Sequence, residues 1–105
     1  MSEIAGKTQA RVKSGIKPRE PKMYAVLLHN DDITTMDFVV EILVRIFHKT
    51  PAQGAEIMMN VHENGCGVAG VFTYDIAVTK KLQADLYSRQ HNYPLKLTVD
   101  EATNL

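Results

Sequence analysis

Residues 23–40 read MYAVLLHNDDITTMDFVV, and this stretch decides how the chain folds. The apolar run 23–28 follows Pro21 and predicts a short strand. The run ends at 29–32 (HNDD), where an imidazole, an amide and two carboxylates gather. Asn and Asp prefer turns and helix caps, so these four residues predict a loop. Functional side chains are often carried on loops that a rigid scaffold holds, which makes this cluster the first candidate site.

A helix is predicted to follow this loop. Thr34 can cap its first turn, and Asp37 three residues later completes a variant of the capping box. The spacing of the next apolar residues is helical, at Met36, Val39, Val40, Leu43, Ile46 and Phe47. The stretch therefore predicts an amphipathic helix.

A second helix is predicted to begin after Thr50. Thr50 can cap it, Pro51 suits the first turn, and Gln53 can bond back to the cap. Asn64-Gly65 is expected to end it, because both residue types tolerate a left-handed backbone.

The rest of the chain predicts two more strands and a third helix. Residues 66–72 form an apolar strand, in which the only cysteine, Cys66, is expected to be a small core residue. Residues 73–92 show a helical pattern, and residues 95–99 alternate as a third strand. The polar tail 100–105 is expected to fray.

The predicted element order is therefore β-α-α-β-α-β. This order predicts an α+β fold, a three-stranded antiparallel sheet packed against three helices on one face. A chain of 105 residues suffices for one domain with a modest core.

The formal net charge of zero hides an asymmetry along the chain. Residues 1–22 carry six Lys or Arg and two Glu, whereas residues 23–105 carry six Lys or Arg and ten Asp or Glu. The first segment has few large apolar residues, so it predicts a flexible basic extension before the folded domain of residues 23–105. Its basic residues are diluted and the domain is acidic, which argues against a nucleic-acid partner.

The sequence also indicates a compartment. Its longest apolar runs fall well short of the roughly 20 residues of a membrane span, and the first seven residues lack the apolar core of a signal peptide. A single cysteine precludes an internal disulfide, in agreement with a reducing environment. We therefore expect a cytoplasmic protein without a membrane partner.

Several blocks of the sequence occur together in a fixed order. Residues 30–39 read NDDITTMDFV, which is similar to the pattern N-D-D-x-T-x-M-x-F-V. Further blocks are 58–62 (MMNVH), 70–73 (GVFT), Thr79-Lys80 and Pro94-Leu95. Over residues 22–100 the chain thereby resembles the ClpS family, the adaptors of the bacterial Clp protease.

The resemblance implies an adaptor that recognises N-degrons and is not an enzyme. ClpS proteins bind substrates whose first residue is Leu, Phe, Tyr or Trp. They deliver these substrates to a hexameric AAA+ unfoldase, ClpA or a ClpC-type relative, which feeds the ClpP peptidase. The resemblance implies no cofactor, and we expect a monomer.

By the resemblance, Asn30, Asp31 and His62 bind the α-ammonium group of the substrate. An amino terminus offers three N–H donors beside a side chain, so acceptors must converge next to an apolar pocket. A carboxylate on Asp31 makes the stronger, charge-assisted hydrogen bond. Asp32 and Thr34 are expected to support the site, Asp32 through the turn and Thr34 mainly as the helix cap.

The pocket for the substrate side chain is likewise implied by the resemblance. The matching positions are Met36, Val39, Met58, Val61 and Leu95, with Ile33 beside them. Met36 is predicted to gate the pocket, and a β-branched first residue is expected to bind weakly because it would crowd this side chain. The alternative interpretation is that methionines at helical spacing are ordinary core residues.

Asp75, Thr79 and Lys80 match the family positions that dock on the unfoldase. The chain has Val78 where the family commonly has glutamate. The extension 1–22 is expected to engage the unfoldase during transfer. In the alternative interpretation, Lys80 and Lys81 belong to a solvated helix face.

Two other classes of protein remain open at this point. His29, Asp31, Asp32 and His62 could ligate a divalent ion in a metal-binding protein or small metal-dependent enzyme, although their spacing matches no recognised ligand motif. An assembly module that binds partners through its helices is the second alternative. The fold type also resembles the C-terminal domain of the ribosomal stalk protein, so fold alone does not decide the function.

Overall fold

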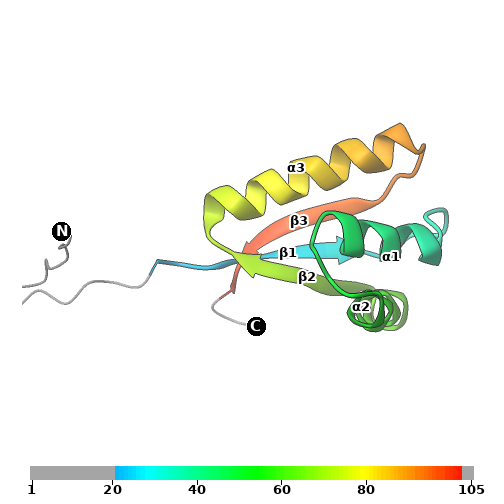
Figure 1. The fold of residues 1–105 in the computed structure, drawn as a ribbon, viewed down its shortest axis with the longest axis horizontal. Coiled ribbons are helices and arrows are strands. Elements are labelled where there is room, and N and C mark those ends of the chain that lie inside the picture. The colour runs from blue at the N-terminus through cyan, green and yellow to red at the C-terminus, as the bar shows by residue number, and fades with distance from the viewer. Residues whose placement is uncertain (1–20, 103–105) are drawn as a thin grey trace, which may run out of the picture.

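The computed structural model describes residues 21–102, which form one three-stranded sheet and three helices (Figure 1). The elements are β1 (Tyr24–His29), α1 (Met36–Arg45), α2 (Pro51–Asn64), β2 (Cys66–Phe72), α3 (Tyr74–Gln90) and β3 (Lys96–Glu101). The strand order is β2-β1-β3, and both pairings are antiparallel. The predicted order and fold class are confirmed. Residues 1–20, most of the predicted extension, lie outside the described residues.

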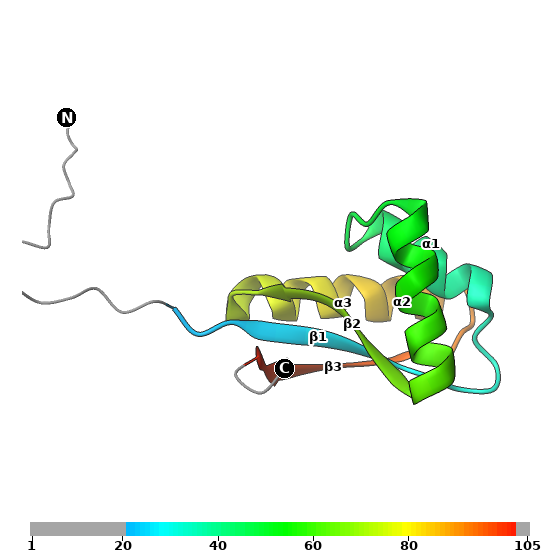
Figure 2. The same ribbon diagram turned by 90° about the horizontal axis from the view of Figure 1, so that it is seen from below.

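The three helices cover one face of the sheet (Figure 2). Alternation along β1 directs Val26 and Leu28 into the core, where both are fully buried. From α1, Ile42 and Leu43 are also fully buried, and each such side chain stabilises the fold by roughly 1.5–3 kcal/mol. Phe38 joins α1 to α3, because its ring stacks on that of Tyr87 with centroids 5.7 Å apart.

The predicted start of α1 is wrong by one residue. Thr35, not Thr34, is the N-cap, and its hydroxyl accepts a hydrogen bond from the Phe38 N–H at 3.2 Å. The Thr34 hydroxyl instead donates to the Asp31 carboxylate at 2.8 Å. The helix has Ile46 as its C-cap, so Phe47, the last residue of the predicted helical spacing, lies just beyond it.

Both ends of α2 agree with the sequence. Thr50 and Gln53 form a capping box, with reciprocal hydrogen bonds of 3.0 and 3.1 Å. Gly65 is the C-cap with φ 87°, a conformation that glycine adopts without strain. The Gly65 carbonyl accepts a hydrogen bond from the Asn30 N–H at 2.8 Å, which ties the end of β1 to the end of α2.

Three further expectations need correction. Cys66 is exposed and is not a core residue, because it begins β2 opposite His29 at the end of the sheet. The strand β3 runs to Glu101 instead of fraying after residue 99, since Asp100 and Glu101 pair with Ala25 and Tyr24. The helix α3 ends at Gln90, two residues before the predicted end.

Candidate functional site

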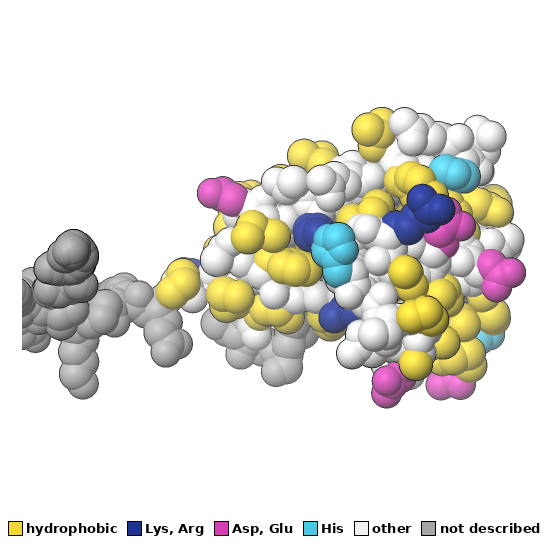
Figure 3. All heavy atoms as spheres, in the orientation of Figure 1, with side chains coloured by type: hydrophobic (Ala, Val, Ile, Leu, Met, Phe, Trp, Pro, Cys, Tyr) yellow, Lys and Arg dark blue, Asp and Glu magenta, His cyan; other side chains and the backbone are white. Residues whose placement is uncertain are grey.

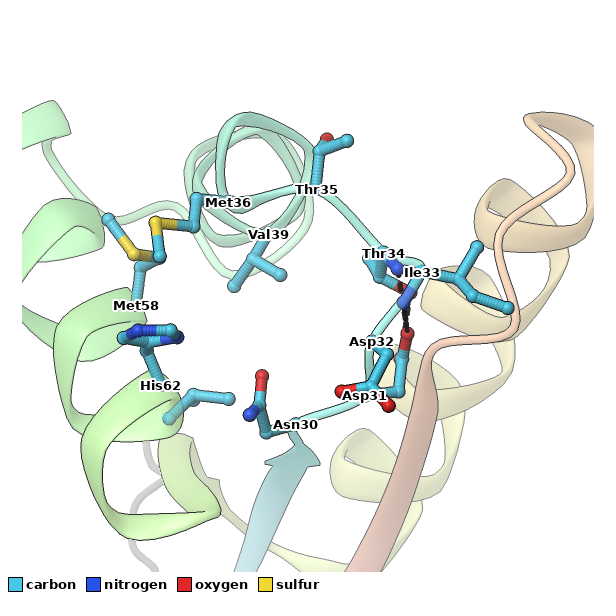
Figure 4. Close-up of a pocket in the computed structure, with 11 residues that line it drawn as sticks. Asn30, Asp31, Asp32, Ile33, Thr34, Thr35, Met36, Val39, Met58 and His62 are labelled. Carbon is cyan, nitrogen blue, oxygen red and sulfur yellow. Dashed lines mark hydrogen bonds between the residues drawn. The ribbon is translucent and has the colours of Figure 1, made fainter.

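A cavity of about 390 Å³ lies at the end of β1, between α1 and α2 (Figure 4). Its lining comes from the loop after β1, the first turn of α1 and the second half of α2. The lining residues are Asn30, Asp31, Asp32, Ile33, Thr34, Thr35, Met36, Val39, Met58, Val61 and His62. The fold thus brings Asn30, Asp31 and Asp32 of the sequence cluster together with His62, thirty residues further along the chain.

The apolar part of the lining comes from two helices. Met36 and Val39 belong to α1, and Met58 and Val61 belong to α2. The two valines are buried, whereas Met36 is 44% exposed. The cavity therefore has stiff side chains in its interior and a flexible methionine at its opening.

The polar part of the lining faces these apolar side chains. The side-chain amide of Asn30 extends from the end of β1 toward the cavity, and His62 lies across from it on α2 (Figure 4). The hydrogen bond from the Asn30 N–H to the Gly65 carbonyl fixes this loop to the helix that carries His62. Acceptors from separate elements are thus held beside an apolar chamber.

Both carboxylate oxygens of Asp31 accept hydrogen bonds from residues of its own loop. Its Oδ1 accepts hydrogen bonds from the N–H groups of Ile33 at 2.8 Å and Thr34 at 2.7 Å (Figure 4). Its Oδ2 accepts from the Thr34 hydroxyl at 2.8 Å. Burial by itself raises the pKa of Asp31, but the hydrogen bonds from Thr34 and Ile33 outweigh it and lower the pKa below the ordinary value of 3.8.

Asp32 differs from its neighbour. It lines the same cavity, but no hydrogen bond or ion pair within residues 21–102 uses its carboxylate. The two adjacent carboxylates are therefore inequivalent. Asp31 shapes the loop, and Asp32 has acceptor sites free for a ligand.

Three placements depart from the expected lining. Ile33 is 66% exposed and its side chain points away from the cavity, so it belongs to the rim (Figure 4). Leu95 is buried in the core and is not among the cavity residues. Thr35 lines the cavity, and the sequence analysis missed it. Two consecutive threonines can each cap a helix, and only the folded loop shows which one does.

The residues expected to dock on the unfoldase lie on α3. The Thr79 hydroxyl donates to the Asp75 carbonyl at 2.8 Å, and the Lys80 ammonium donates to the Ile46 carbonyl at 2.8 Å. Lys80 thus satisfies a carbonyl at the end of α1. Hydrophobic side chains reach the surface on this side of the molecule (Figure 3), and those exposed on α3 are Tyr74, Ile76, Leu82 and Leu86.

The metal-site alternative finds no support in the described part of the chain. Across residues 21–102, no three His, Cys, Asp or Glu side chains are grouped so that they could hold a metal ion. His29 is outside the cavity, and its Nε2 lies 2.8 Å from the Thr98 hydroxyl. No helix in this same part of the chain is long and apolar enough to span a membrane.

Comparison with known proteins gives concordant matches. The family model described as "ATP-dependent Clp protease adaptor protein ClpS" matches residues 19–98. A ClpS adapter protein of Syntrophus aciditrophicus is 58% identical over 85 residues, which are 81% of this chain and 79% of the relative. The corresponding protein of Clostridium acetobutylicum is 51% identical over 90 residues, which are 86% and 89% of the two chains.

A solved structure is similar as well. Agrobacterium tumefaciens ClpS2, bound to L-phenylalaninamide, superimposes with a TM-score of 0.75 at 35% sequence identity. The match covers 78% of this chain and 99% of that one.

Proposed function

The chain belongs to the ClpS family of adaptors of the ATP-dependent Clp protease, and on this premise we propose that its cavity binds the first residue of N-degron substrates. The accepted first residues are Leu, Phe, Tyr and Trp. An adaptor of this family is not an enzyme, so the site has to bind and orient without catalysing a reaction. The observation that supports the proposal is one cavity that joins an apolar chamber to convergent acceptors.

Three acceptors suit the three N–H donors of an α-ammonium group. The Asn30 amide oxygen and one neutral ring nitrogen of His62 accept from two sides of the cavity. We assign the carboxylate to Asp32, because both oxygens of Asp31 already accept hydrogen bonds from Ile33 and Thr34. Asp31 adds its negative charge to the site and holds the loop in shape.

The apolar chamber supplies the second part of the affinity. Burying a Leu or Phe side chain is worth roughly 1.5–3 kcal/mol, and each charge-assisted hydrogen bond roughly the same. One buried side chain and two or three such bonds are sufficient for binding in the micromolar range. The ligand of the Agrobacterium relative, L-phenylalaninamide, has the same two features, a free amino group and a large apolar side chain.

The proposal is tested by fluorescence anisotropy with peptides that differ only in their first residue. We expect the Leu-first peptide to bind at least tenfold more tightly than the Ala-first peptide, about 1.4 kcal/mol. Acetylating the Leu-first peptide should abolish binding, because it removes the charge and two donors. Equal affinities for Leu-first and Ala-first peptides would rule out N-degron recognition.

The assignment of the carboxylate is tested by two isosteric variants. Asp32→Asn should weaken the Leu-first peptide by about tenfold or more and leave the unfolding free energy nearly unchanged. Asp31→Asn should mainly lower stability, because it disturbs the loop hydrogen bonds. The reverse outcome would return the ammonium-binding role to Asp31.

We also propose that α3 docks on a ClpA- or ClpC-type unfoldase through Asp75, Thr79 and Lys80. The exposed side chains of Ile76 and Leu82 on the same helix support this surface, because large exposed apolar groups often mark protein–protein contacts. In this proposal the protein acts in the cytoplasm as a monomer, and the basic extension 1–22 engages the unfoldase during transfer.

A further inference from the structure

Gly67 in β2 lies against Val61, one of the residues that line the cavity. Gly67 pairs with Leu28 on the face of the sheet that the helices cover. A Cβ atom added at Gly67 would lie 2.9 Å from Cγ2 of Val61 and 3.4 Å from the Ile57 carbonyl oxygen. Carbon atoms do not approach this closely, so any side chain at position 67 forces a displacement.

Val61 has little freedom to accommodate this displacement. Its side chain is 2% exposed and lines the cavity, and β-branching makes it stiff at χ1. Its own N–H nitrogen would lie 3.5 Å from the added Cβ, so the backbone of α2 is close as well. Val61 lines the cavity, which gives its side chain room to yield in that direction.

We propose that Gly67 sets the depth of the cavity through Val61 and so determines how large a first residue is accepted. Gly67 is a positioning residue that does not touch the substrate. The inference rests on the proposed function of the cavity. With glycine at position 67, Val61 sits low enough for an aromatic ring, whereas a methyl group there raises Val61 and makes the cavity shallower. A shallower cavity penalises Phe and Trp more than the smaller Leu.

The test measures anisotropy with Leu-first, Phe-first and Trp-first peptides of otherwise identical sequence. We expect Gly67→Ala to lower the Phe-to-Leu and Trp-to-Leu affinity ratios by roughly tenfold. The matched control is Gly54→Ala, the same change on α2, whose added Cβ would lie nearest to Val40, Val44 and Leu43 of α1. None of these three lines the cavity, so the control should keep both ratios within about twofold.

A second pair of variants shows whether the effect passes through Val61. Val61→Ala removes the crowding methyl groups and should shift preference toward Trp. Adding Gly67→Ala to Val61→Ala should then leave the ratios unchanged, because the added methyl meets no Val61 side chain. Val61→Ala and the double variant still test the role of Val61 if the single variant Gly67→Ala does not fold.

The outcomes separate the two proposals. A wild-type protein that does not prefer Leu-first over Ala-first peptides refutes the proposed function and this inference with it. A selective wild type whose ratios are unchanged in Gly67→Ala refutes only the role of Gly67. An equal ratio change in the presence and absence of the Val61 side chain refutes the coupling through Val61.

Discussion

The helices α1 and α3 meet the rest of the molecule in different ways. α1 buries large side chains, including Phe38, Ile42 and Leu43. α3 buries only small ones, namely Ala77, Ala84 and Ser88, and leaves Leu82 58% exposed. The difference indicates that α1 is a supporting wall of the fold and of the cavity, whereas α3 leaves several of its larger apolar groups at the surface, as the proposed docking role requires.

The largest expected effect tests the supporting role of α1. Ile42→Ala should lower the free energy of unfolding by about 2–5 kcal/mol, because it leaves a hole in a fully buried site. Urea denaturation measures the change. A loss below about 1 kcal/mol would show that α1 is less tightly packed than its burial indicates.

The next effect tests the exposed face of α3. Leu82→Ser should change the unfolding free energy by no more than about 0.5 kcal/mol. It should reduce unfoldase-dependent degradation of a Leu-first substrate by roughly tenfold, about 1.4 kcal/mol of docking energy. Anisotropy with the isolated peptide is the control and should be unaffected. Normal degradation would remove Leu82 from the docking surface.

A smaller effect compares the starts of the two helices. The Thr35 hydroxyl accepts a hydrogen bond from the Phe38 N–H, whereas the Thr73 side chain makes no capping bond. Thr35→Ala should therefore cost about 1 kcal/mol of unfolding free energy, and Thr73→Ala clearly less. The pair is measured in one urea series. Equal losses would mean that the hydrogen bond accepted by the Thr35 hydroxyl adds no unfolding free energy beyond what Thr73 contributes without such a bond.

The smallest effect concerns pH and the loop that leads into α1. The lowered pKa of Asp31 means that its carboxylate contributes stability above its unfolded-state pKa and loses this contribution as pH falls through the native pKa. The contribution is small, because solvent screens a partly exposed carboxylate. The stability difference between wild type and Asp31→Asn should therefore be present at pH 7 and shrink at pH 3. A constant difference would contradict the hydrogen-bond explanation.

Sequence patterns predicted the elements well where the signals are local. The capping box of α2 and the glycine at its end involve residues within one helical turn of each other, and both are confirmed. Prediction failed where two neighbours compete for one role. Thr34 and Thr35 are equally good caps by residue type, and Asp31 decides between them by binding the Thr34 hydroxyl.

The candidate site could be predicted only in part. Ten of the eleven cavity residues were named from the sequence, seven by the resemblance and three as their neighbours, and the one missed, Thr35, lies in the quoted motif. Leu95 was placed in the pocket, although the structure buries it in the core outside the cavity lining. Whether Leu95, just before β3, faces the cavity or the core depends on how α1 and α2 pack, and its residue type alone does not determine this.

The sequence by itself determined the order of elements and the helix caps of α2, because these depend on periodicity and on contacts within a few residues, and its resemblance to a known family indicated most of the site residues. Only the tertiary structure decided how far β3 extends and which glycine lies against Val61. The hydrogen bond from the Lys80 ammonium to the Ile46 carbonyl joins residues 34 positions apart and is likewise visible only in the folded structure. Such features depend on distances between segments far apart in the chain, and those distances exist only once the helices have packed on the sheet.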